Sequence, residues 1–218
     1  MFYENKIYPL QDKVLAALDG AGTRFYLTGG TVLSRCYFNH RYSDDLDFFV
    51  NDDSQFGQYM MSVYSSLKRA GIAMELTIDE SRYKRLVADQ ILKIEFVNDV
   101  PFYLGEPRPI PEFPFRAIDN LQNILANKIT ALRDRTEIKD LVDIREIALQ
   151  TKPDWKMIFS AADSKSAGIF PPQIAEKMEN FDLVSLERIN WITKPDPLLF
   201  AKDIQRIIAD ILSIPIIK

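Results

Sequence analysis

The stretch FYLTGGTVLSRCYFNHRYSDDLDFFV, residues 25–50, decides the fold that the sequence predicts. Phe25 to Leu27 favour a buried strand, and Gly29-Gly30 then lets the backbone turn sharply because neither residue has a Cβ atom. A helix is predicted from Thr31, with apolar residues at helical spacing behind it. The free N–H groups at the start of that helix point back at the glycine turn, so the turn suits a phosphate group.

The same stretch ends in an acidic strand. Strand alternation from residue 44 to residue 50 places Asp45 and Asp47 on one face, with Leu46 and Phe48 on the other. Neighbouring carboxylates repel each other, and their desolvation is costly. A bound divalent cation offsets both the repulsion and the desolvation cost. Oxygen ligands suit Mg²⁺ or Mn²⁺, and Mg²⁺ is usually held by one or two carboxylates together with substrate phosphates. The sequence therefore predicts a metal site beside the phosphate turn, whereas a solvated edge strand is the alternative.

These residues resemble the AbiEii nucleotidyltransferases, a group within the polymerase-β-like superfamily. The signature of that group is Gly-Gly-Thr or Gly-Ser, a spacer, and then Asp-x-Asp. This chain has Gly29-Gly30-Thr31 and, further on, His40-Arg41-x-Ser43-x-Asp45-Leu46-Asp47. The resemblance implies transfer of an NMP from an NTP, with Mg²⁺ or Mn²⁺ as cofactor. It also implies that Gly29, Gly30 and Thr31 bind the nucleotide and that Asp45 and Asp47 are catalytic metal ligands.

A third carboxylate is predicted on a later strand. Three strands are expected after residue 70, and they span residues 73–78, 83–88 and 90–97. Alternation in the last of these places Lys93 and Glu95 on one face, so Glu95 can face the acidic pair. The resemblance implies that such a residue completes the metal site and is catalytic, and Glu95 is the candidate. The alternative is an exposed Glu95 paired with Lys84 or Lys93, with competing carboxylates at Asp79, Asp89 and Asp99.

The overall composition is that of a globular protein of one domain, or of one domain plus a helical appendage. The chain has 218 residues, of which 47% are hydrophobic, and a formal net charge of -4. This charge gives no global field for nucleic acid, so an RNA contact would need a local basic patch. The single cysteine, Cys36, cannot form an internal disulfide and is predicted to be a buried structural thiol. With no signal peptide or apolar run of the ~18 residues that a membrane span needs, the chain is expected to be cytoplasmic and without a membrane partner.

The predicted fold class is α/β (α+β), a small mixed-sheet core followed by a helical C-terminal part. Residues 101–114 contain five prolines and form a semi-rigid connector. The predicted domains are a nucleotidyltransferase core over residues 1–112 and a helical region over residues 113–218 that closes the nucleotide cleft. Helices are expected within 6–20, 53–70, 119–135, 137–150, 154–163, 171–180 and 197–212.

A second resemblance to the AbiEii group lies in the helices over 119–135 and 137–150. The group has a lysine followed by Ala-Leu, an arginine and a basic-Asp-x-x-Asp block, and this chain reads Lys128-Ile129-Thr130-Ala131-Leu132-Arg133 and Lys139-Asp140-Leu141-x-Asp143. The resemblance implies that Lys128 and Arg133 bind the triphosphate. It also implies a catalytic role for Asp140, which either orients Lys128 or takes part in proton transfer. A solvated basic helix face is the alternative, and it leaves Arg135 and Asp143 undecided.

The function expected from these patterns is metal-dependent transfer of an NMP to a macromolecular acceptor. The expected mechanism uses two cations bridged by Asp45 and Asp47, with Glu95 at one of them. RNA, with tRNA first, is favoured over protein hydroxyls because basic residues gather near residues 82–93 and 128–145 in an acidic chain. The resemblance implies a toxin-antitoxin or phage-defence system, and with it a cognate antitoxin protein. The alternative is a non-catalytic nucleotide- or partner-binding regulator on the same fold, although the intact acidic triad argues against it.

Overall fold

The computed structural model describes residues 2–215, and they form two compact units. Of the described residues, the first unit comprises 2–101 and 106–120, and the second comprises 102–105 and 121–215. The predicted division into 1–112 and 113–218, with closure of a nucleotide cleft, stays a prediction. Its outer ends, residue 1 and residues 216–218, lie outside the described residues.

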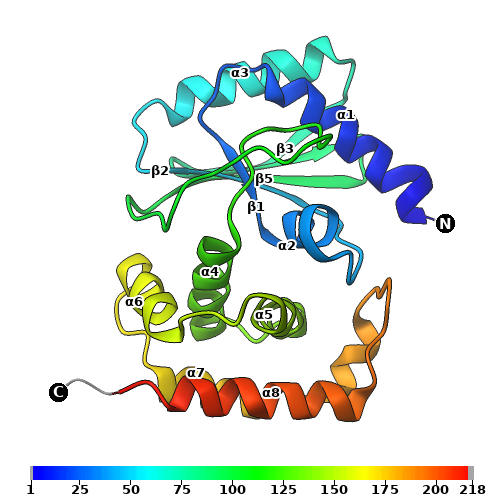
Figure 1. The fold of residues 1–218 in the computed structure, drawn as a ribbon. Coiled ribbons are helices and arrows are strands. Elements are labelled where there is room, and N and C mark those ends of the chain that lie inside the picture. The colour runs from blue at the N-terminus through cyan, green and yellow to red at the C-terminus, as the bar shows by residue number, and fades with distance from the viewer. Residues whose placement is uncertain (1, 216–218) are drawn as a thin grey trace. The chain divides into compact units, whose positions relative to one another are not determined.

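The first unit is built on a mixed five-stranded sheet (Figure 1). The strand order is β1-β2-β5-β4-β3, in which β2 and β5 run parallel and the other neighbouring pairs run antiparallel. The predicted mixed α/β core is therefore confirmed. The elements in chain order are η1 (Tyr3–Ile7), α1 (Tyr8–Asp19), β1 (Tyr26–Thr28), α2 (Gly29–Val32), η2 (Leu33–Phe38), β2 (Leu46–Asn51), α3 (Phe56–Arg69), β3 (Met74–Asp79), β4 (Tyr83–Ala88) and β5 (Leu92–Asp99).

The two faces of the sheet differ as the alternation predicts. Leu46, Phe48 and Val50 of β2 are buried, while the residues between them are only half-buried. The strand β5 repeats this pattern, with Ile94 and Phe96 fully buried. Helices α1 and α3 lie over one face of the sheet (Figure 1). The opposite face carries the carboxylates of β2 and β5, because side chains alternate along a strand.

The connector after β5 returns to the sheet beside β1. Leu27 donates its N–H to the carbonyl of Ala117 over 2.8 Å, and the N–H of Asp119 donates to the Leu27 carbonyl over 2.9 Å. The Thr28 hydroxyl donates to Asp119 over 2.6 Å. These bonds fix the end of β1, where the glycine turn begins.

The second unit is helical. Its elements are α4 (Leu121–Asp134), α5 (Ile138–Thr151), α6 (Trp155–Lys165), α7 (Pro171–Glu179), η3 (Leu183–Arg188) and α8 (Pro197–Leu212). Aspartates cap three of them: Asp154, Asp182 and Asp196 each accept a backbone N–H from the first turn of the helix that follows. Within residues 2–215, no helix is both long and apolar enough to cross a membrane.

Candidate active site

The glycine turn lies directly against the acidic strand. Gly29 has φ +76°, and a Cβ atom on it would come within 2.5 Å of an Asp47 carboxylate oxygen. The Thr31 hydroxyl is buried, donates to the Asp45 carbonyl and lies 3.0 Å from the Ser43 hydroxyl. Only glycine permits this approach, because a side chain at this φ is strained and would displace the carboxylate. The turn predicted to bind phosphate and the strand predicted to bind metal are therefore held together.

A buried arginine supports the second glycine of the turn. Arg41 is only 6% exposed, and a Cβ atom on Gly30 would collide with its guanidinium group. Its carbonyl accepts the Ser34 hydroxyl over 2.5 Å, and its Nη1 donates to the Tyr42 carbonyl over 3.1 Å. The structure places its positive charge next to the glycine turn.

The register of the parallel pair β2 and β5 aligns the predicted metal ligands. Asp47 lies opposite Glu95, and the preceding pair is Leu46 with Ile94. The Nζ atom of Lys93 lies 2.8 Å from Asp45 Oδ2 and 3.6 Å from Glu95 Oε1. The three predicted carboxylates thus share one face of the sheet, with a lysine among them.

Glu95 is held by groups of β4 as well as by Lys93. Its Oε1 accepts the Tyr83 hydroxyl over 2.6 Å and Arg85 Nε over 2.9 Å. Burial acts to raise the pKa of Glu95, but the Tyr83 hydrogen bond and the charges of Lys93 and Arg85 outweigh it, so the pKa is lowered. Burial and the bond to Glu95 raise the pKa of Tyr83 to about 12. Glu95 is therefore an ionised carboxylate that Tyr83, Arg85 and Lys93 hold in place.

The donor set of this face fits a divalent cation at Asp45 and Asp47. Both side chains are half-buried, offer oxygen ligands only, and border the phosphate turn. Glu95 lies beside Asp47, but its Oε1 already accepts the Tyr83 hydroxyl, pairs with Arg85 and lies 3.6 Å from Lys93 Nζ. In the described part of the chain, no three His, Cys, Asp or Glu side chains are grouped as a ready metal site.

The second unit contains the other predicted nucleotide-binding and catalytic residues. Lys128 is 7% exposed, and its Nζ lies 2.7 Å from both Asp140 and Asp143, each fully buried. Arg135 Nε also donates to Asp140 over 2.8 Å. Burial acts to raise the pKa of Asp140, but Lys128 and Arg135 lower it overall. Lys128 thus belongs to a buried ion-pair cluster and not to a solvated basic face, and the catalytic role of Asp140 stays a prediction.

Arg133 is engaged locally. Its Nε lies 2.8 Å from the adjacent Asp134, and its Nη1 donates to the Ala167 carbonyl over 2.9 Å. The side chain is about one third exposed, with a relative exposure of 34%. Its predicted contact with the triphosphate stays a prediction.

The sequence suggested Lys93 as a partner of an exposed Glu95 and as part of a basic patch, but it did not indicate the contact of Lys93 with Asp45. The missing signal was the register of β2 against β5, which two segments far apart in sequence do not reveal.

Cys36 is half-buried, and burial raises the pKa of its thiol to about 12, which keeps it protonated.

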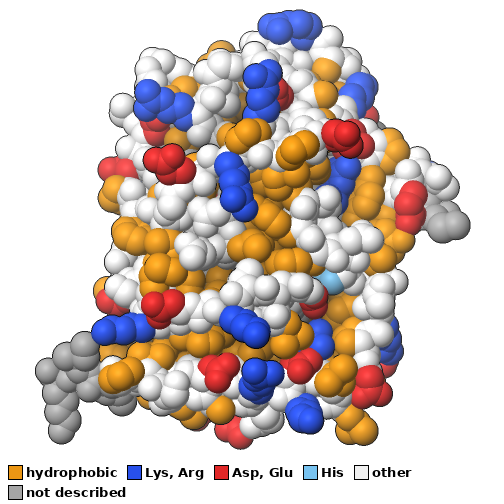
Figure 2. All heavy atoms as spheres, viewed as in Figure 1, with side chains coloured by type: hydrophobic (Ala, Val, Ile, Leu, Met, Phe, Trp, Pro, Cys, Tyr) orange, Lys and Arg blue, Asp and Glu red, His pale blue; other side chains and the backbone are white. Residues whose placement is uncertain are grey.

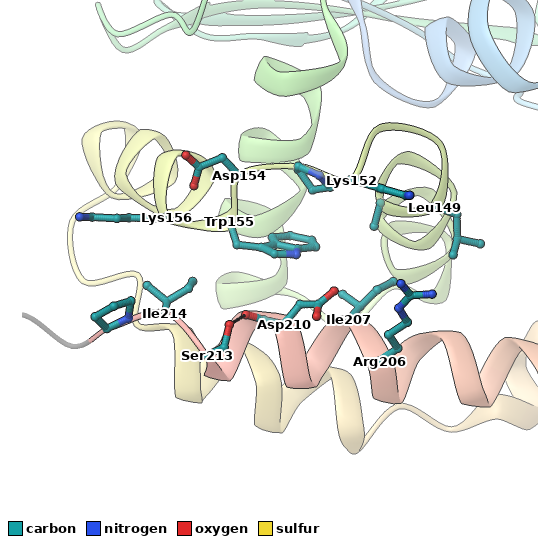
Figure 3. Close-up of a pocket in the computed structure, with 13 residues that line it drawn as sticks. Leu149, Lys152, Asp154, Trp155, Lys156, Arg206, Ile207, Asp210, Ser213 and Ile214 are labelled. Atoms are coloured by element: carbon teal, nitrogen blue, oxygen red, sulfur yellow. Dashed lines mark hydrogen bonds between the residues drawn. The ribbon is translucent and has the colours of Figure 1, made fainter.

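A cavity of about 470 Å³ lies within the second unit and is separate from these residues. It is lined by the end of α5, the start of α6 and the last turns of α8 (Figure 3). Trp155 and Ile207 supply apolar walls, and Lys152, Arg206 and Asp210 supply charges. None of the predicted catalytic or nucleotide-binding residues lines it.

The fold is that of the nucleotidyltransferases. The protein JHP933 from Helicobacter pylori has a TM-score of 0.60 and 20% identity, with 94% of this chain and 90% of that chain covered. A second H. pylori structure, a proposed nucleotidyltransferase, has a TM-score of 0.61 and 21% identity over 94% and 92% of the two chains. The antibiotic-resistance factor ANT(2'')-Ia is similar with a TM-score of 0.52 and 13% identity, over 72% and 89%. At these identities the likeness establishes the fold.

The family follows from the sequence as a whole. The family described as "Nucleotidyl transferase AbiEii toxin, Type IV TA system" matches residues 13–212. The chain therefore belongs to the AbiEii nucleotidyltransferase family. No curated protein matches its sequence. The resemblance drawn from the Gly-Gly-Thr and Asp-x-Asp motifs is confirmed.

Proposed function

We propose that this protein transfers an NMP from an NTP to a macromolecular acceptor, with a divalent metal ion, Mg²⁺ or Mn²⁺, at Asp45 and Asp47. The observation that carries the proposal is the contact between the two motifs. Gly29 approaches the Asp47 carboxylate so closely that a Cβ atom would lie 2.5 Å from it. A phosphate in the turn and an ion on the carboxylates would therefore be neighbours, as nucleotidyl transfer requires.

The site residues of the first unit each have a proposed part in this reaction. The N–H groups at the start of α2 bind phosphate oxygens, and Thr31 fixes that turn to the acidic strand through its bond to the Asp45 carbonyl. Arg41 adds a fixed positive charge behind Gly30. An ion held there would supply Lewis-acid stabilisation of the charge on the phosphate and on the pyrophosphate leaving group. Asp45 and Asp47 hold it, and Glu95 is the predicted third carboxylate.

The second unit is proposed to contribute Lys128, Arg133 and Asp140. The Lys128 ammonium is held by two buried carboxylates, so its position is set before any nucleotide arrives. Preorganised cations of this kind stabilise developing phosphate charge without reorganising. Arg133 would add a planar fork for two phosphate oxygens once it leaves Asp134.

The proposed acceptor is RNA, with tRNA first. Arg82 pairs with Asp52, and both side chains are exposed; Lys84 pairs with the exposed Asp79 but is itself only 18% exposed. Exposed ion pairs are worth about 0–1 kcal/mol, so RNA phosphates can replace these carboxylates at small cost. On the face drawn in Figure 2, basic side chains lie scattered among acidic and apolar ones. RNA binding would therefore replace the carboxylate partners of individual basic side chains, such as Arg82 and Lys84, with RNA phosphates.

A cognate antitoxin protein is the proposed partner, since the family description names a type IV toxin-antitoxin system. An antitoxin that opposes the proposed reaction should restore growth of cells that produce this protein. The alternative of a non-catalytic regulator predicts nucleotide binding without turnover.

The test is incubation of the purified protein with Mg²⁺, each α-labelled NTP in turn, total tRNA and total cell protein. We expect label on tRNA and release of pyrophosphate, both absent with Asp45→Asn and both falling steeply with added salt, since phosphate contacts release counterions. Label on protein alone would overturn the RNA acceptor. Mg²⁺-dependent thermal stabilisation by nucleotides without pyrophosphate release would favour the regulator.

A further inference from the structure

A lysine ammonium lies among the carboxylates proposed to bind metal. Lys93 Nζ is 2.8 Å from Asp45 Oδ2 and 3.6 Å from Glu95 Oε1. Its side chain is 35% exposed, so it is neither deeply buried nor free in solvent. Its charge thus lies between two of the three groups that a second divalent ion would use.

The backbone determines this placement. The parallel register pairs Leu46 with Ile94 and Asp47 with Glu95, so Asp45 and Lys93 come one residue before a paired position on their strands. Side chains two residues apart on a strand share a face, which puts Lys93 beside Glu95 as well as beside Asp45. The lysine therefore reaches the carboxylates from a strand position that does not depend on a mobile loop.

Fixed positive charges offset most of the negative charge of this face. Asp45, Asp47 and Glu95 contribute three negative charges, and Lys93 and Arg85 contribute two positive ones. One negative charge remains before a nucleotide binds. A second divalent ion would have to enter beside an ammonium group, at a cost in like-charge repulsion.

We propose that the Lys93 ammonium replaces the second metal ion, so that the centre takes one divalent ion, on Asp45 and Asp47. Glu95 is then a positioning residue that holds Lys93, and is itself held by Tyr83 and Arg85. This inference rests on the proposed function and narrows its metal requirement. Lys93 and the single ion would share the charge that develops during transfer.

The competing arrangement has Glu95 as a ligand of a second ion. It requires the Oε1 atom to leave the Tyr83 hydroxyl, at 2.6 Å, and Arg85 Nη2, at 2.7 Å. It also requires the ammonium of Lys93 to move away from Asp45. The two arrangements differ in the number of ions bound, which can be counted without a catalytic assay.

The experiment is a count of bound Mn²⁺ per chain by equilibrium dialysis, with free Mn²⁺ read by electron paramagnetic resonance. The protein is saturated with a non-hydrolysable NTP analogue, and the count includes the ion that arrives with it. We expect one ion in the wild type, two in Lys93→Met, and one in Lys93→Arg, which keeps the charge. The control is Lys84→Met on the neighbouring strand, where the lysine pairs with Asp79 instead, and one ion is expected there.

Two ions in the wild type would overturn the proposal whether or not Lys93→Met folds. An unchanged count of one in a folded Lys93→Met would also overturn it. Wild-type protein that binds neither Mn²⁺ nor the analogue contradicts the proposed function itself. A thermal melt of each variant accompanies the count.

Discussion

Asp45 and Asp47 differ in what their carboxylates meet. Asp45 has an ion pair with Lys93, and Asp47 lies against the bare Cα of Gly29. Loss of the charge at Asp45 removes a half-exposed pair, which is worth about 0–1 kcal/mol. We therefore expect Asp45→Asn to keep the fold and to lose the added thermal stability that Mg²⁺ and nucleotide give together. A melt in which Mg²⁺ and nucleotide stabilise Asp45→Asn as strongly as the wild type would refute its role as a ligand.

Loss of Lys128 should cost substantial stability. Its removal leaves Asp140 and Asp143 buried with one partner fewer, and breaking a buried pair typically costs about 3–5 kcal/mol. We expect Lys128→Ala to lower the free energy of unfolding in urea by about that amount, besides weakening nucleotide binding. Lys139→Ala is the control, because Lys139 pairs with Glu137 at the surface. A similar small loss in both variants would mean that the cluster is not a structural element.

The pH dependence of stability should report on the ion pairs of Asp140 with Lys128 and Arg135. The ion pairs of Asp140 with Lys128 and Arg135 outweigh burial and put its folded pKa below its usual value. A carboxyl whose pKa is lowered by folding contributes stability above its unfolded pKa of about 4, and this contribution is lost as the pH falls through the folded pKa. The stability gap between wild type and Asp140→Asn should thus be constant at neutral pH and shrink below about pH 4. A gap independent of pH would argue against the pairing.

At the scale of elements, glycine geometry sets the junction of β1 and α2, where the helix begins at Gly29 and not at Thr31 as predicted. Gly29→Ala places a side chain at φ +76° and within 2.5 Å of the Asp47 carboxylate. We expect a loss of about 1–2 kcal/mol of stability from the left-handed conformation. Transfer activity should fall further, because Asp47 must move.

The control for Gly29→Ala is Gly57→Ala in α3, where an added Cβ atom meets nothing within 4 Å and φ is not positive. That change should leave activity unchanged and stability equal or slightly higher, because alanine is the better helix former. Chemical unfolding and a transfer assay compare the two variants. Equal activity in both would show that the turn does not position Asp47.

The helices and strands were predicted where their periodicity is long. The alternation in β2 and β5 and the helical spacing in α3, α4, α5 and α8 all correspond to observed elements. The strand β1 was predicted one residue early, at Phe25 to Leu27, and spans Tyr26–Thr28. The short segment η3 was not predicted, because six residues in 3₁₀ form carry too little periodicity to stand out.

At the scale of the whole molecule, the family and the fold class followed from two motifs, but the contacts between distant segments did not. Motif spacing identified Asp45, Asp47 and Lys128 as a set. It could not show that Lys128 is enclosed by Asp140 and Asp143, since burial of a charge depends on helix packing. Nor could it show Lys93 beside Asp45, which depends on strand register.

The central claim is that the carboxylates beside the glycine turn carry nucleotidyl transfer. The most direct measurement is the single-turnover rate of pyrophosphate release in wild type, Asp47→Asn and Asp44→Asn. Asp44 is the matched control, because it is an exposed aspartate three residues before Asp47. We predict a fall of about three orders of magnitude or more in Asp47→Asn, since a metal ion contributes several kcal/mol of charge stabilisation, and a near-native rate in Asp44→Asn. Equal rates in Asp47→Asn and Asp44→Asn would contradict the assignment of this site.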